Sequence, residues 1–332
     1  MPHPKHDGGY RLGIVNPQML VGAEIKTILR ERSFPFERVT LLATGEGAGT
    51  LTEVGDEPAI VAAVSDDELE DLDVVFFCGR AEENREWIAK HDEDDFIAVD
   101  LSQPTTAEDG RLAVAGINLD RIDEADGVLV SPHPIAIPIA LILNRIAALS
   151  RIESCTATVV QPASEYEQAG VEELAQQTIS VLNIQTVPKQ VFDRQLAFNL
   201  YPAVERNEEI IVEQIKSLTD ARAQIALMIT QGTIFHGHTF SLFVRTNEDL
   251  DATDIESSLR NDPAIALPEG DQQFGTIDAA GKDEVLVAEV RNDPAIRGGF
   301  WVWAVCDNLR RSSALNAVLV AEKVLFGSGV TN

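Results

Sequence analysis

Two closely spaced histidines, His236 and His238, are the residues of this sequence best placed for metal chemistry. On a strand, residues two apart point to the same face, so the two imidazoles would supply half of a zinc-type site. No cysteine or carboxylate at a matching spacing completes the ligand set. The pattern therefore predicts no metal site.

Three thiols and one short loop are the other candidates for nucleophilic chemistry. Cys78, Cys155 and Cys306 are far apart and make neither a CxxC pair nor a disulfide framework. Each is expected in a buried strand, where apolar surroundings raise the pKa of a thiol and hide it. Ser131 and His133 follow another apolar run, but the spacing reveals no partner base for either side chain. We expect all five residues to be structural.

The elements of the first half must bring such residues together at one edge of a sheet. An apolar run at 10–16 predicts a strand, and the spacing of apolar residues at 21–32 predicts a helix. A further helix is expected at 82–91, and further strands at about 38–44, 74–78, 96–100 and 127–131. Because these strands are almost entirely apolar, they indicate a doubly wound, Rossmann-like parallel sheet that is covered on both faces.

The pattern changes after Pro134. An apolar helix to about 149 precedes a long strand at 151–161 and a helix at 164–182, with Glu167 as its capping acid. Later strands at about 222–230, 234–246, 284–291 and 300–306 alternate with period two, which is typical of a mixed or antiparallel sheet with one covered face. A final helix at 312–326 is expected to return to the first domain.

The charge balance limits the kinds of partner. The 332 residues carry 26 Lys and Arg against 54 Asp and Glu, a formal charge of −28. So acidic a surface repels phosphate backbones and anionic headgroups, and we expect neither a nucleic acid nor a membrane partner. It favours solubility, with an acidic docking surface for a basic partner as the alternative. With no secretion-type N-terminus, and a longest apolar stretch, 135–143, far shorter than the roughly 20 residues of a spanning helix, we expect a cytoplasmic protein.

Four motifs of the second half occur together in an order and spacing that resemble the aspartate-semialdehyde dehydrogenase family. They are Arg-Gln-Leu-Ala-Phe-Asn at 194–199, Phe-His-Gly-His at 235–238, Asp-Ala-Ala-Gly-Lys-Asp at 278–283 and Asp-Asn-Leu-Arg at 307–310. The resemblance extends from about 11 to 326 and is greatest to the Usg-type relatives, which also lack the cysteine nucleophile. The family's enzymes interconvert an acyl phosphate and an aldehyde with NADP(H) through a thioester on that cysteine.

The resemblance places a proline where the nucleophile belongs. The family's Asn-Pro-Asn-Cys corresponds to Ser131-Pro132-His133-Pro134. Proline has neither a nucleophilic atom nor a backbone donor, so no thioester can form at Pro134. We therefore expect no catalytic residue at this position.

The cofactor loop departs from the family pattern as well. The family's Gly-x-x-Gly-x-x-Gly corresponds to 16–22, where only Gly22 is retained and Asn16, Pro17 and Met19 put side chains where the phosphates would lie. The family's arginine for the 2′-phosphate falls at Glu46. We interpret Glu46 as an exposed acid in a Gly-rich turn, with acceptance of a ribose hydroxyl of NAD as the alternative. If a nucleotide does bind, the resemblance implies contacts from Gly13, Gly22, Thr44, Glu46, Gly79 and Asn308.

The family's two anion-binding arginines are also missing. The segment 101–109 contains no basic residue, and Gln231 replaces the arginine that grips the substrate carboxylate. We interpret the other positions that correspond to the family's active site as a vestigial pocket. It consists of His238 in the place of the family's base, Gln161 in that of the carbonyl-holding glutamine, Glu213 with Lys216, and the altered positions Pro134 and Gln231.

The sequence thus predicts an α/β protein with a Rossmann-like NAD(P)-binding-type domain at 1–133 and 312–332. An α+β dimerisation domain with a mixed or antiparallel sheet is expected at 134–311. The preferred hypothesis is a non-catalytic, Usg-like homodimer that needs no cofactor and binds a small ligand or another protein. The alternative is an NAD(P)-dependent aldehyde or acyl-phosphate oxidoreductase of amino-acid biosynthesis with altered substrate and mechanism, using NADP or NAD. A third possibility is an inactive subunit that pairs with an active relative.

Overall fold

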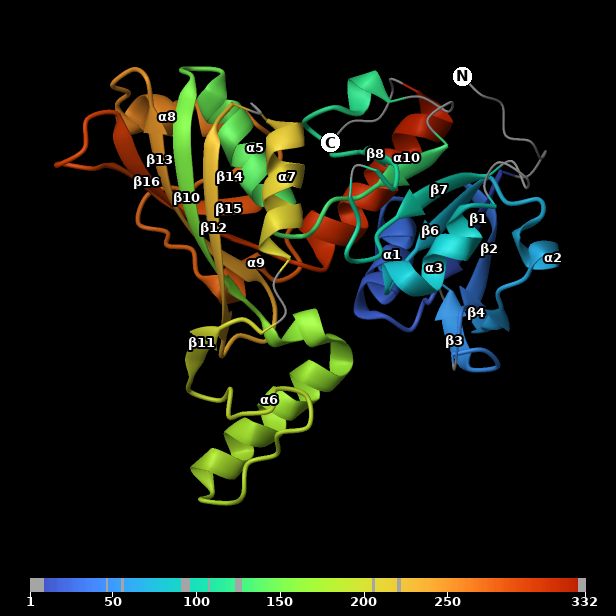
Figure 1. The fold of residues 1–332 in the computed structure, drawn as a ribbon. Helices are drawn as coiled ribbons and strands as arrows, with labels where there is room; N and C mark the ends of the chain where they lie inside the picture. The colour runs from blue at the N-terminus through green and yellow to red at the C-terminus, as the bar shows by residue number, and fades with distance from the viewer. Residues whose placement is uncertain are drawn as a thin grey trace. The chain divides into compact units, whose positions relative to one another are not determined.

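A computed structural model describes residues 9–45, 47–54, 57–90, 96–106, 108–122, 127–204, 207–219 and 222–327. The chain divides into two compact units (Figure 1). The first is Met1–His133 with Ser313–Asn332, and the second is Pro134–Ser312.

The first unit is built on a seven-stranded sheet in the order β5-β2-β1-β6-β7-β9-β8, and every pairing in it is parallel. The Rossmann-like part of the predicted fold is thereby confirmed. A separate hairpin is formed by β3 and β4, which pair only with each other. The strands are β1 Tyr10–Val15, β2 Phe36–Ala43, β3 Leu51–Val54, β4 Glu57–Ile60, β5 Ala62–Ala63, β6 Val74–Phe77, β7 Ile97–Asp100, β8 Arg111–Leu112 and β9 Val128–Val130.

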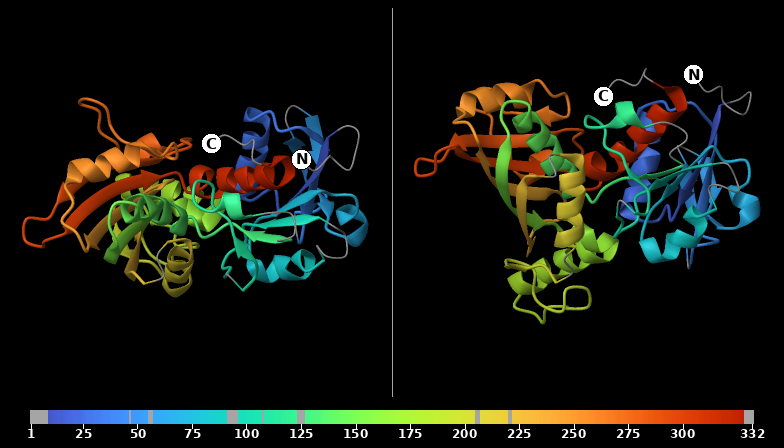
Figure 2. Two further views of the ribbon diagram at one scale, coloured as in Figure 1. Left: turned by 90° about the horizontal axis from the view of Figure 1, so that it is seen from above. Right: turned by 45° about the horizontal axis from the view of Figure 1, so that its top comes forward.

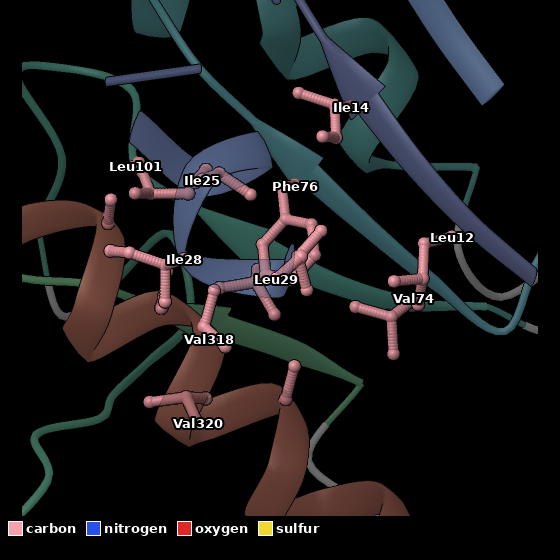
Figure 3. Close-up of a cluster of buried hydrophobic side chains, with 14 of the residues drawn as sticks. Leu12, Ile14, Ile25, Ile28, Leu29, Val74, Phe76, Leu101, Val318 and Val320 are labelled. Carbon is pink, nitrogen blue, oxygen red and sulfur yellow. The ribbon is translucent and has the colours of Figure 1, made fainter. Parts of the chain in front are cut away.

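Helices cover both faces of this sheet because alternate strand residues point to opposite sides. One face packs Leu12, Ile14 and Phe76 against α1 (Leu20–Glu31) and α10 (Leu315–Phe326), as Figure 3 shows for the labelled side chains. The opposite face, with Val75 and Phe77, packs near α2 (Asp66–Leu69) and α3 (Ala81–Ile88). A 3-10 turn at Leu119–Arg121 lies between β8 and β9.

The C-terminal helix belongs to the first unit, as the sequence predicts. The expected helix from 312 is a π-helical turn at Arg310–Ala314 followed by α10. Figure 2 shows the red α10 beside the blue α1, and Arg32 at the end of α1 reaches Glu322 through two hydrogen bonds of 2.7 and 2.6 Å. This bidentate pair therefore links α1, near the start of the chain, to α10, near its end, within the first unit.

The second unit contains a mixed seven-stranded sheet in the order β11-β12-β10-β13-β16-β15-β14, which confirms the second half of the predicted fold class. The pairs β10–β12 and β14–β15 are parallel and the others are antiparallel. The strands are β10 Ile152–Gln161, β11 Leu200–Pro202, β12 Gln224–Gly232, β13 His238–Thr246, β14 Ile265–Ala266, β15 Val285–Asn292 and β16 Gly299–Cys306.

The helices of this unit are α5 Ala136–Ala147, α6 Glu167–Leu182, α7 Glu208–Leu218, α8 Ala252–Arg260 and α9 Thr276–Ala279. Within this unit, α5 packs against α7 and α8, while α6 projects beyond the ends of β10 and β12 (Figure 1). The helix expected at 164–182 is divided. Ala163–Tyr166 form a 3-10 turn, and α6 starts at Glu167, whose φ of 57° breaks the helical path. Glu167 therefore begins α6 and does not cap a helix from 164.

No helix in the described part of the chain is long and apolar enough to cross a membrane.

Candidate functional site

In the first unit the strand order changes direction at β1. This position defines the edge of the sheet at which a ligand is expected. From β1 the chain runs outward through β2 and β5 on one side and through β6, β7 and β9 on the other. Ligands of such sheets bind outside the carboxyl ends of the strands at this switch point. In this chain the flanking loops begin at Asn16, after β1, and at Cys78, after β6.

The side chain of Asn16 connects these two loops. Its Nδ2 donates hydrogen bonds to the carbonyl oxygen of Cys78 at 3.0 Å and to Oγ1 of Thr44 at 3.1 Å. Its Oδ1 accepts the N–H of Thr44, after β2, at 3.1 Å. Asn16 is only 4% exposed and has a φ of 58°, a conformation that asparagine tolerates better than most residues. One amide therefore links the carboxyl ends of three strands.

The two glycines nearest this amide are required by backbone packing. A Cβ on Gly22 would lie 2.8 Å from Cα of Pro17, so glycine lets the start of α1 close against the preceding loop. Gly79 has a φ of 101°, and a Cβ on it would lie 3.3 Å from Nδ2 of Asn16. Both glycines therefore serve the loop arrangement itself.

The other predicted nucleotide contacts serve packing or lie elsewhere. Gly13 is inside β1, where a Cβ would lie 2.8 Å from Cδ1 of Leu72. Thr44 is already bonded to Asn16, and Glu46 lies outside the described residues. A dinucleotide site requires bare backbone at the switch point so that the pyrophosphate can approach. The side chain of Asn16, bonded to Thr44 and to the carbonyl oxygen of Cys78, lies at this switch point.

The segment 101–109 begins beside a buried carboxyl group. Burial raises the pKa of Asp100, at the end of β7, to about 6, although its carboxylate accepts hydrogen bonds from the N–H and hydroxyl of Ser102. Arg85, on α3, reaches this segment with Nη2 3.6 Å from Oδ1 of Asp109, and its charge partly offsets the effect of burial on the pKa of Asp100. A second cation of this edge is Arg80, which pairs through its backbone with Gln103. Its guanidinium is exposed and donates to Glu82 at 2.8 Å. The sequence analysis did not single out Arg80, because its contact with 103 arises only from the sheet topology.

The segment in the position of the family's nucleophile motif follows β9 and leads into α5. Ser131 accepts a hydrogen bond from Asn316 on α10 at 3.0 Å and donates its N–H to Asp100. Burial lowers the pKa of His133 to about 4, which keeps this imidazole neutral. Pro134 lies in the turn just before α5 and is half-buried. Ser131 and His133 therefore lie in packed surroundings and have no geometry of an activated nucleophile.

In the second unit, His238 opens β13 beside a carboxylate that the sequence did not single out. Its Nε2 lies 3.3 Å from Oε1 of Glu165, and the same oxygen accepts a hydrogen bond from Nδ2 of Asn308 at 3.2 Å. Asn308 also accepts the N–H of Gly237 at 2.9 Å and donates to Ser164 at 3.1 Å. Burial raises the pKa of Glu165 to about 7. Asn308 therefore links Glu165, Ser164 and Gly237 by hydrogen bonds, and the imidazole of His238 lies against the carboxylate of this cluster.

The two glutamines of the predicted pocket are paired with each other. Gln161 and Gln231 are register partners on β10 and β12, and Nε2 of Gln161 donates to Oε1 of Gln231 at 2.8 Å. Nε2 of Gln231 in turn donates to the carbonyl oxygen of Gln161 at 3.2 Å. Both side chains are buried, Gln231 completely. The amide expected to hold a substrate carbonyl is thus engaged by the residue that replaced the arginine.

The thiol nearest to His238 in the sheet is that of Cys306, its direct register partner on β16. Residues opposite each other on antiparallel strands share a face, so this thiol and the imidazole are neighbours. Sγ of Cys306 is oriented toward the carbonyl oxygen of Asp307 and Oγ of Ser312, at 3.6 and 3.9 Å. Burial raises the pKa of Cys306, and likewise that of Cys155, to about 12. Cys306 is therefore a buried thiol, although it lies closer to His238 than the sequence suggested.

The remaining predicted residues do not join this cluster. Glu213 and Lys216 lie on α7, exposed and half-buried. His236 precedes β13 in a bend, so the expectation that it shares a strand face with His238 is wrong: Gly237, with a φ of 85°, turns the chain between them. Among the described residues no three His, Cys, Asp or Glu side chains form a metal-ligand group.

The fold of each unit matches one family model. Residues 12–132 match the semialdehyde dehydrogenase NAD-binding domain, and 143–311 match the semialdehyde dehydrogenase dimerisation domain. The chain therefore belongs to the semialdehyde dehydrogenase family, as the motifs of its second half predict.

Its relatives include proteins of two names. An aspartate-semialdehyde dehydrogenase of Rickettsia conorii is 26% identical over 330 residues, covering 95% of this chain and 98% of the relative. A USG-1 protein homolog of Azotobacter vinelandii is 29% identical over 326 residues, covering 95% and 97%. Among solved structures, aspartate semialdehyde dehydrogenase II of Vibrio cholerae, complexed with ASA, has a TM-score of 0.89 at 27% identity, covering 95% and 97%.

Proposed function

We propose that this chain is a non-catalytic member of the aspartate-semialdehyde dehydrogenase family that acts as a homodimeric ligand-binding or partner protein. The observation that carries the proposal is Pro134, in the turn before α5, at the position that resembles the family's cysteine. A ring nitrogen without a proton and a side chain without a heteroatom cannot form or release a thioester.

The arrangement of the first unit supports the same proposal. Hydride chemistry on a nicotinamide requires that the dinucleotide be held by its pyrophosphate at the switch point. Asn16 bridges the loops after β1 and β6 there, with its amide bonded to Thr44 and to the carbonyl of Cys78. Displacing that side chain would break these hydrogen bonds, so binding of NAD(P) should be weak.

The pocket of the second unit supports it from the substrate side. A substrate carboxylate needs a cation, and Gln231 is neutral and paired with Gln161. His238, which resembles the family's base, faces Glu165, and the thiol beside it is buried and protonated. The homodimer is supported by the match to a dimerisation domain at 143–311.

Isothermal titration of the purified chain with NADP and with NAD tests the proposal. The aspartate semialdehyde dehydrogenase of Candida albicans, whose solved structure contains NADP, serves as the positive control. We expect no heat of binding at millimolar nucleotide. The variant Asn16→Gly removes the bridging amide while keeping a residue that tolerates positive φ. Micromolar binding by the unmodified chain would contradict the proposal.

The alternative function is an NAD(P)-linked oxidoreductase with an altered mechanism. The dehydrogenase names of several relatives and the register pairing of Cys306 with His238 favour it. Under this alternative, NAD(P)-dependent turnover of an aldehyde would be abolished by Cys306→Ser or His238→Gln. Under the proposed function, neither variant has an activity to lose.

A further inference from the structure

A cavity of about 330 Å³ lies in the first unit between α1, the start of β2 and the hairpin β3–β4. It is lined by Lys26, Leu29, Arg30, Ser33, Phe34, Phe36, Val39 and Val54. These residues come from the C-terminal half of α1 and the elements beside it, whereas the switch point lies at the helix's N-terminal end. The cavity is therefore a second concave surface of this unit.

The walls of the cavity are largely apolar. Leu29 and Phe34 belong to the buried core, and Phe36, Val39 and Val54 pack against it. An engineered apolar cavity of ~150 Å³ is large enough to hold benzene. A space of about 330 Å³ therefore accommodates an apolar body of roughly two rings.

Two cations lie on the rim. Lys26 and Arg30 are one helical turn apart on the same face of α1, so their head groups are neighbours. Nζ of Lys26 donates a hydrogen bond to Oγ1 of Thr52 on β3 at 2.9 Å, and no ion pair of Lys26 or Arg30 occurs among the described residues. Burial lowers the pKa of Lys26, which a bound anion would counteract.

A second hollow continues from these two cations. It has a volume of about 490 Å³ and is lined by Ala23, Lys26, Thr27, Arg30, Leu51, Thr52, Glu53 and Pro58. Lys26 and Arg30 belong to both linings, so they separate an apolar compartment from one that contains hydroxyl groups. The carboxylate of Glu53 also lines this hollow, and its charge partly offsets the effect of burial on the pKa of Lys26. In a chain with 54 acidic and 26 basic residues, two adjacent cations that form no salt bridge within the described part of the chain are an unusual local charge.

We infer that this cavity binds a small amphiphilic anion, with its apolar body among Phe34, Phe36 and Val39 and its carboxylate or comparable group at Lys26 and Arg30. The apolar walls supply the hydrophobic contribution, and the two cations supply charge-assisted hydrogen bonds that fix the orientation. The inference is independent of whether the switch point binds a nucleotide.

Titration of the full chain with 2-naphthoate, and with the uncharged 2-naphthamide, tests the inference by calorimetry. We expect one saturable site per chain for naphthoate and at least about tenfold weaker binding of the amide, since hydrogen bonds to charged groups are the stronger ones. Lys26→Met and Arg30→Met should each weaken naphthoate binding about tenfold. Arg38→Met is the matched control, because Arg38 is exposed and points away from the side of β2 that Val39 presents.

Two further variants keep the outcome interpretable. Lys26→Arg retains the charge and should retain binding, so a loss in Lys26→Met alone is not a folding effect. Val39→Phe places a ring in the cavity and should weaken naphthoate and naphthamide alike. Equal affinity for naphthoate and naphthamide, no effect of removing either cation, or no saturable binding at millimolar naphthoate would overturn the inference. Displacement of naphthoate by NADP would place the bound naphthoate at the switch point and would likewise overturn the inference.

Discussion

At the scale of single residues, Asn16 is the residue on which the proposed loss of nucleotide binding depends. Asn16 occupies the position where a dinucleotide-binding sheet needs a residue without a side chain, and its amide joins the ends of β1, β2 and β6. The sequence predicted an obstruction at 16–19. It could not predict the partners of Asn16, because Thr44 and Cys78 approach it only through the parallel pairing of three strands.

The contribution of Asn16 to stability can be measured. Asn16→Ala removes buried hydrogen bonds and places a Cβ residue at a φ of 58°, so we expect a loss of about 3 kcal/mol in the free energy of unfolding. Asn16→Gly loses the same hydrogen bonds without the backbone strain and should cost about 1 kcal/mol less. Urea unfolding of the three proteins provides the comparison. Equal stability of Asn16→Ala and the unmodified chain would contradict the bridging role.

The titration of Glu165 should be visible as a pH dependence of the free energy of unfolding. Its pKa in the folded chain is raised to about 7 by burial, so between pH 4.5 and 7 the folded state holds a proton that the unfolded state has released. Stability should therefore fall as pH rises through this window, by at most about 1.4 kcal/mol per pH unit.

Glu165→Gln removes this contribution. The slope of the unfolding free energy between pH 5 and 7 should be flatter in Glu165→Gln than in the unmodified chain, while Glu172→Gln, an exposed carboxylate on α6, should keep the original slope. Asp100 is retained in both variants, so the difference reports Glu165 together with its contact to His238. Identical slopes in all three proteins would refute the assignment.

At the scale of elements, period and composition predicted most strands, and the deviations come from a long-range contact and from turns at positive φ. The apolar run at 74–78 is β6, Val74–Phe77, and the alternation in 300–306 is β16. The helix expected from 164 was too long, because Ser164 accepts a hydrogen bond from Asn308, 144 residues away, and the chain turns at Glu167. The strand expected from 234 begins only at His238, because Gly237 adopts positive φ. Such long-range contacts leave no periodic signal.

The segment that follows α6 forms neither a helix nor a strand. Two side chains of α6, Glu173 and Gln177, bind its backbone. The carboxylate of Glu173 accepts the backbone N–H groups of Gln190, Val191 and Phe192. Gln177 accepts those of Leu196 and Ala197. Three backbone donors on one carboxylate are a strong constraint, because each bond to a charged group contributes about 1.5–3 kcal/mol.

Glu173→Ala should release this segment. Lys189 and Arg194 are exposed within it, so trypsin should cleave there at least several times faster than in the unmodified chain. Glu172→Ala, one residue earlier and exposed, is the control and should leave the rate unchanged. Unaltered cleavage in Glu173→Ala, followed by mass spectrometry of the fragments, would exclude the anchoring role.

At the scale of the whole molecule, the family match supports assembly through the second unit. Large apolar side chains are exposed there on or near α6, β11 and β12, namely Ile179, Leu182, Ile184, Phe198, Leu200 and Met228. Exposed apolar surface of this kind marks interaction sites more often than solvated ones. Phe198 belongs to the motif at 194–199, one of the four that resemble the family.

The proposed homodimer predicts a solution mass of two chains. Light scattering after size exclusion should give that mass, and Leu200→Asp with Met228→Asp should shift it toward one chain. Leu51→Asp, which places the same charge on an equally exposed leucine of β3, should leave the dimer intact. A single-chain mass for the unmodified protein at micromolar concentration would contradict assembly through this unit.

The oxidative turnover of aspartate semialdehyde tests the central claim most directly. The purified chain should show no phosphate-dependent oxidation of this aldehyde with NADP or NAD, while the Vibrio cholerae relative in the same assay provides the positive control. Pro134→Cys should remain inactive, because Asn16 still fills the switch point and Gln231 still replaces a cation. Turnover by the unmodified chain, abolished by Cys306→Ser, would contradict the claim that this member of the family has lost its chemistry.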